Sequence, residues 1–110
     1  MLTEIAMNTL IAEIGKGIGQ VKAFIDGKLN LIPITWDLLV YRFKEWRKEY
    51  PKAVGFVIVE LAEEGNYSIV QGMINQDTSE VYIAVRIESK YMDDKARDVL
   101  LNGPKIKIFS

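Results

Sequence analysis

The side chains that most often carry out chemistry in proteins are scarce in this sequence. The 110-residue chain has no cysteine and no histidine, which removes thiolate nucleophiles, cysteine-ligated metal sites and the imidazole general base. Acid–base or metal chemistry would have to use carboxylates, lysines or tyrosines. Carboxylates lie close together at residues 60–64, 77–80 and 93–94, but none of these groups matches a known Mg²⁺ or Ca²⁺ loop. We therefore predict no catalytic residue, no metal site and no cofactor.

Three alternating glycines, Gly15, Gly17 and Gly19, form the first pattern that resembles a ligand-binding loop. A phosphate-binding loop follows a strand and opens a helix, so that backbone N–H groups point at the anion. Here the glycines follow a predicted helix and precede a predicted strand. Gln20 also stands where the G-x-G-x-x-G pattern requires glycine. The series therefore predicts the end of a helix and a turn.

Positive charge is concentrated in residues 42–52. Five cations and two acids give this segment a charge of +3, while the rest of the chain sums to -4. Such a patch could bind phosphates or an acidic partner. It could also be the solvated face of a helix, because a chain with a pI near 5.5 lacks the basic balance of most nucleic-acid-binding domains. The candidate surface for an anionic partner consists of Arg42, Lys44, Arg47, Lys48 and Lys52.

Aromatic side chains follow a helical spacing through the same segment. Trp36, Leu39, Phe43, Trp46 and Tyr50 are separated by three or four residues, which places them on one face of a helix of about 15 residues. We expect them to pack on a sheet, and any ring left uncovered to contact another subunit, since Trp and Tyr are enriched at interface centres. The candidate interface residues are Trp36, Trp46, Tyr50, Tyr82 and Arg86.

Residues 52–59 are similar to the RNP1 octamer of the RNA-recognition-motif family at Lys52, Gly55, Phe56 and Val57. The sequence differs from the octamer at three other positions. At one of them the family has an aromatic residue on which a base stacks, and this sequence lacks it. The order of elements also differs from the βαββαβ order of that family. Because the run is almost entirely apolar, we predict a buried strand with Phe56 in the core.

The elements that would position these residues follow from the apolar periodicity. Residues 3–18 have apolar side chains at three- and four-residue spacings, which predicts a helix capped by Thr3. Residues 21–25 and 29–32 are β-prone runs on either side of Asp26–Gly27. This pattern favours a type I′ hairpin.

Beyond the hairpin, Thr35 is a candidate N-cap for the aromatic helix, and Pro51 ends that helix. Residues 53–61 predict a central strand covered on both faces. In the strand predicted over residues 80–88, apolar side chains alternate with Tyr82, Ala84, Arg86 and Glu88, so one face should be buried and one solvated. The remaining predictions are a strand at 67–74, a short helix before Asn102–Gly103–Pro104, and an edge strand at 105–109 whose lysines discourage association.

The resulting order, α-β-β-α-β-β-β-α-β, predicts one α+β domain over residues 1–110. Its sheet is expected to be a single, largely antiparallel layer of five to six strands with three helices. Through the third helix, this order is similar to that of the Roadblock/LC7 proteins of the profilin-like group. That resemblance implies a small dimerising module.

These observations favour a non-enzymatic protein-interaction module that self-associates, most simply as a symmetric dimer. The alternative is nucleic-acid binding through the basic aromatic helix, with a phage or viral accessory protein as one setting, and an enzyme using carboxylates, lysine or tyrosine is the third hypothesis. The N-terminal residues lack a basic start, and the densest apolar run, residues 54–59, is far shorter than the roughly 20 residues of a membrane span. We therefore expect no cleaved leader, no membrane segment and, by default, a cytoplasmic location.

Overall fold

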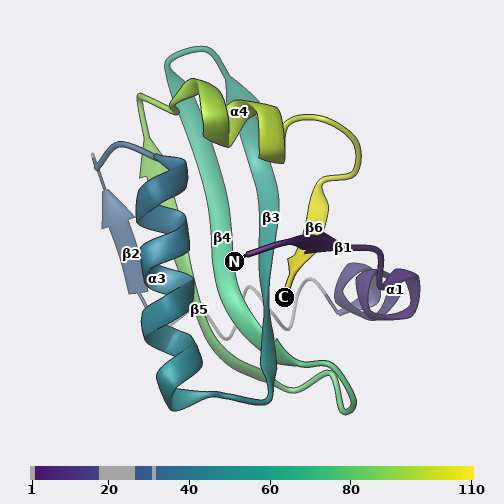
Figure 1. Ribbon diagram of the computed structural model, residues 1–110. Helices are drawn as coiled ribbons and strands as arrows, with labels where there is room; N and C mark the ends of the chain where they lie inside the picture. The colour runs from purple at the N-terminus through teal and green to yellow at the C-terminus, as the bar shows by residue number, and fades with distance from the viewer. Residues whose placement is uncertain (1, 18–26, 31) are drawn as a thin grey trace.

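The computed structural model describes residues 2–17, 27–30 and 32–110 (Figure 1). The elements in chain order are β1 (Glu4–Ile5), α1 (Asn8–Lys16), β2 (Gly27–Asn30), α3 (Trp36–Glu49), β3 (Ala53–Glu63), β4 (Asn66–Asn75), β5 (Val81–Ser89), α4 (Asp94–Leu100) and β6 (Ile106–Phe109). Within these ranges the predicted α+β class is confirmed. The described residues form three helices and one largely antiparallel sheet.

The sheet has the strand order β1-β6-β3-β4-β5-β2. All neighbours from β1 to β5 in that order are antiparallel, and β3, β4 and β5 form the predicted meander. β2 lies parallel to β5, with Gly27 opposite Val85 and Asn30 opposite Glu88. The second strand of the predicted hairpin overlaps β2 at residues 29–30, but the prediction that Gly27 lies in the turn is wrong, because Gly27 is already paired with Val85 in this strand. Its first strand, at residues 21–25, lies outside the described residues.

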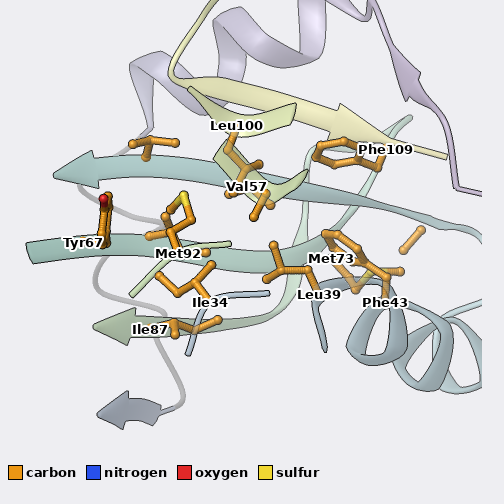
Figure 2. Close-up of a cluster of buried hydrophobic side chains, with 14 residues drawn as sticks. Ile34, Leu39, Phe43, Val57, Tyr67, Met73, Ile87, Met92, Leu100 and Phe109 are labelled. Carbon is orange, nitrogen blue, oxygen red and sulfur yellow. The ribbon is translucent and has the colours of Figure 1, made fainter. Parts of the chain in front are cut away.

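Helices cover both faces of the sheet. Along β3, Val57 and Val59 belong to one buried cluster, which also contains side chains of α3 and α4. Phe56 and Ile58 belong to a second cluster on the opposite face, to which α1 contributes Leu10 and Ile14. Figure 2 shows part of the first cluster, including Leu39, Phe43 and Leu100 near Val57 and Met73. Because Ala53 to Val59 is buried throughout, the predicted central strand is confirmed.

The predicted N-terminal helix is wrong over its first residues. Thr3 does not cap a helix: Glu4 and Ile5 pair with β6, and the N–H of Ser110 donates to the Thr3 carbonyl at 2.9 Å. Pairing with β6 overrides the helical periodicity because it satisfies the backbone and buries apolar surface on the sheet. The helix ends where the glycine series predicts, with Gly17 as C-cap. Gly17 has a φ of -97°, so this C-cap glycine is not in the left-handed conformation.

The C-terminal strand is also placed differently from the prediction. β6 is not an edge strand, because it lies between β1 and β3. Lys107 is only 3% exposed, and its Nζ donates to the Asn102 carbonyl at 2.5 Å and lies 3.5 Å from Oε2 of Glu4. Lys107 therefore binds neighbouring segments instead of protecting a sheet edge. The edge on this side is formed by the two-residue β1.

Candidate functional site

The helix that carries most of the candidate residues is α3, and two polar side chains fix its start. Thr35 is the predicted N-cap, with Oγ1 accepting from the N–H of Leu38 at 3.2 Å. Asp93 Oδ1 accepts from the N–H of Trp36 at 3.2 Å and from the N–H of Ala96, the third residue of α4, at 2.9 Å. One carboxylate thus orients the starts of both α3 and α4. It also satisfies N–H groups that have no partner within their own helices.

The aromatic stripe of α3 packs on the sheet, as expected. Phe43 is almost fully buried, and its ring lies 5.8 Å from that of Phe109, centroid to centroid. The ring of Trp36 lies 5.5 Å from Phe109. Tyr50, the C-cap residue, stacks on Tyr82 of β5 with centroids 5.0 Å apart. The rings predicted to form an interface are therefore half-buried and engaged in contacts within the chain.

A glycine in β3 permits this close packing. A Cβ atom added to Gly55 would lie 2.6 Å from Cδ1 and 3.0 Å from Cζ of Phe43. These distances are shorter than carbon–carbon van der Waals contacts. The Phe43 ring therefore occupies the space that any larger residue at position 55 would need.

Arg42, the first residue of the predicted basic surface, is turned toward the sheet. Its Nη1 donates to Oε1 of Gln71 at 2.7 Å, while Nε2 of the same glutamine donates to the Leu39 carbonyl at 2.9 Å. Gln71 is fully buried. Burial lowers the pKa of Arg42 from its ordinary value, although a guanidinium stays charged in proteins. Arg42 thus connects α3 to β4.

The other predicted basic residues lie away from the core. Lys44, Lys48 and Lys52 are exposed and Arg47 is half-buried. Nζ of Lys48 lies 3.2 Å from Oε1 of Glu45, one turn earlier on the helix. Such exposed pairs stabilise proteins weakly, by about 0–1 kcal/mol. The structure therefore divides the predicted five-residue surface, with Arg42 inward and three lysines outward.

Tyr82 and Arg86 do not share a solvated face of β5, so that expectation is wrong. A register shift between Met73 and Ile74 pairs them with Ile83 and Val81, and Tyr82 is the additional residue. Tyr82 then packs with Tyr50 on the face covered by α3. The bulge interrupts the simple alternation that the sequence suggested.

Arg86 lies on the opposite face, across from Val70 of the second cluster. Its Nε and Nη2 donate to the two carboxylate oxygens of Glu60 at 2.7 and 3.2 Å. The hydrogen bond with Glu60 is the main cause that raises the pKa of Arg86. Ala84, on the same supposedly solvated face, is fully buried. This face of β5 is therefore largely covered.

The most exposed large apolar side chains of the described residues differ from those predicted. They are Tyr41 at 62%, Tyr91 at 55%, Leu38 at 41% and Leu101 at 38%. Tyr41 and Leu38 lie out of phase with the aromatic stripe of α3. Their positions in the sequence could therefore have indicated that they face away from the sheet. We use the term outer ridge for the exposed residues Asp37, Leu38, Tyr41, Lys44, Glu45 and Lys48 of α3.

A cavity of about 500 Å³ lies between the start of α1 and the β4–β5 turn. Its lining includes Met7, Asn8 and Glu13 from the first segment and Asp77 and Ser79 from the second. It contains none of the predicted site residues. Across the described ranges, no three Asp or Glu side chains converge in a way that could hold a metal ion. None of the helices in these ranges is long and apolar enough to cross a membrane.

Comparisons with known proteins supply no identity for the chain. No protein-family model matches it. No curated protein matches it, and no solved structure does.

Proposed function

We propose that this protein is a non-enzymatic interaction module that self-associates, most simply as a symmetric dimer, through the outer ridge of α3. One observation supports the proposal above the others: Tyr41, 62% exposed, lies next to Leu38 in the middle of an otherwise charged helix face. Tyrosine is among the residues enriched in interface cores, where its ring supplies a large contact area. An exposed tyrosine at the centre of a helix is well placed for this role.

The way α3 is held supports the same proposal. Its inner face is anchored through Phe43 on Gly55, through Arg42 and Gln71, and at its start through Asp93. The outer ridge is therefore presented on a rigid element. A partner that binds it needs to order little of the backbone, and preorganisation of this kind favours affinity.

The proposal is tested by measuring self-association directly. Sedimentation equilibrium from about 1 μM to about 1 mM covers weak and moderate dimers, and the wild-type chain is expected to form dimers within that range. Tyr41→Ser should weaken the dimer at least tenfold. Tyr91→Ser is the matched control, because Tyr91 is similarly exposed but lies outside α3, and it should leave the affinity unchanged. A chain that remains monomeric at the highest concentration would overturn the proposal.

A second candidate function is nucleic-acid binding, which the exposed Lys44, Lys48 and Lys52 favour. Phosphate binding by lysine is independent of sequence and weakens steeply as salt increases. We expect any such binding to appear at low salt and to fall when Arg47 and Lys48 are replaced by glutamate. Unchanged electrophoretic mobility of both DNA and RNA at low salt would exclude this candidate.

A further inference from the structure

We propose that two copies of the chain pack their α3 helices antiparallel, so that Asp37 of each copy faces Lys44 of the other beside a central pair of Tyr41 rings. This arrangement rests on the proposed function and specifies its geometry. It follows from the charges of the outer ridge and their spacing along the helix.

The two charges are suited to an intermolecular contact because neither is paired with another side chain of the described residues. Among the described residues, neither Asp37 nor Lys44 forms an ion pair or a side-chain hydrogen bond, whereas Lys48 and Glu45 are already paired with each other. Both Asp37 and Lys44 are exposed. They are seven residues apart, which is about two helical turns, so they lie on the same side of the ridge.

The spacing fixes the position of the symmetry axis. A two-fold axis that brings Asp37 of one copy level with Lys44 of the other passes each helix midway between its own Asp37 and Lys44, beside Tyr41. The same operation brings the two Tyr41 side chains next to each other and repeats the Asp37–Lys44 contact on the other half of the interface. At the usual helix separation of about 8–10 Å, these side chains are long enough to meet.

Antiparallel packing is favoured over parallel packing for two reasons. In a parallel pair each residue lies level with the same residue of the second copy, so that Asp37 would face Asp37 and Lys44 would face Lys44. It would also align the two helix dipoles, whereas an antiparallel pair places each positive N-terminal end near a negative C-terminal end. Glu45, the other acid that Lys44 could meet in a parallel pair, is engaged by Lys48.

A charge-reversal cycle tests this geometry. In the antiparallel dimer, D37K places two lysines opposite each other and K44D places two aspartates opposite each other, so each variant should weaken the dimer at least tenfold. The double variant D37K/K44D restores opposite charges at both contacts and should recover an affinity within about threefold of wild type. A parallel dimer predicts no loss of this kind for either single variant, because like charges are already level.

Matched controls exclude effects of net charge and folding. D98K and K95D make the same charge changes on exposed positions of α4 and should leave the dimer affinity unchanged. Circular dichroism verifies that each variant is folded, and K44D alone tests the contact if D37K is unstable. If the wild type dimerises but the double variant does not recover, this arrangement is overturned and the proposed function stands. If the wild type is monomeric, both are overturned.

Discussion

Replacing Gly55 with alanine tests how tightly α3 is seated on the sheet. The new Cβ would lie 2.6 Å from Cδ1 of Phe43, so the ring and the helix that carries it must move. Overpacking of this kind costs about 1–3 kcal/mol. Alanine recovers about 0.5–1 kcal/mol of the stability that glycine loses in a strand. We therefore expect a net loss of about 1–2 kcal/mol, since the closest contacts are with a buried ring that has little room to shift.

Urea unfolding, followed by tryptophan fluorescence, measures this loss, and a thermal melt should show Tm lowered by about 4–10 °C for a domain of this size. Gly27→Ala is the matched control: it adds the same methyl group in β2, where no atom of the described residues lies within 4 Å of the new Cβ. In the double variant G55A/F43L the smaller side chain should relieve the clash. The loss of unfolding free energy in the double variant should therefore be smaller than the sum of the losses in the two single variants. The reasoning is refuted if G55A costs no more than G27A.

Three further substitutions probe contacts that position α3 and the sheet. Gln71→Leu removes the partner of Arg42 and of the Leu39 carbonyl, and urea unfolding should show a loss of about 1–3 kcal/mol; an unchanged midpoint would contradict the buried contact. Lys107→Met keeps the packing and removes a buried charge; because the Glu4 carboxylate that it leaves is half-exposed and stays solvated, stability should change by less than about 1 kcal/mol, whereas Lys107→Ala should cost more by calorimetry. Thr35→Ala should cost about 1 kcal/mol through loss of the N-cap, and Thr35→Ser should retain most of it in the same assay.

Where a local signal and the tertiary contacts agree, the sequence predicts the structure well. Thr35 and Pro51 mark the limits of α3, because a cap and a proline act on the backbone directly. The uniformly apolar run of β3 predicts a strand covered on both faces for a similarly direct reason. The meander of β3, β4 and β5 follows from the short connections between them.

Predictions failed where a distant partner decides the outcome. Glu4 and Ile5 belong to a segment with helical periodicity, but they pair with β6, more than 100 residues further along the chain. The face of Tyr82 depends on a bulge against β4, which alternation alone does not predict.

The candidate surface shows the same division between local and distant information. Helical spacing correctly predicted which rings of α3 face inward. It also grouped Arg42 with the solvated lysines, because the sequence gives no indication that Gln71 is buried beneath the helix. The exposure of Tyr41 was implicit in its phase relative to Phe43, but it gains importance only once the other rings are seen to be engaged.

The contact between β1 and β6 has a consequence for the order of folding. Hairpin contacts within β3, β4 and β5 join residues that are near in sequence, whereas Glu4 meets Phe109 only after a loop of more than 100 residues closes. Closing a loop of that length costs conformational entropy, and β1, which has only two residues, makes few contacts that could offset this cost. We expect the meander to form first and β1 to add last. In native-state hydrogen exchange, the amides of β1 should therefore exchange through local opening, while those of β3 and β4 exchange only when the whole sheet unfolds.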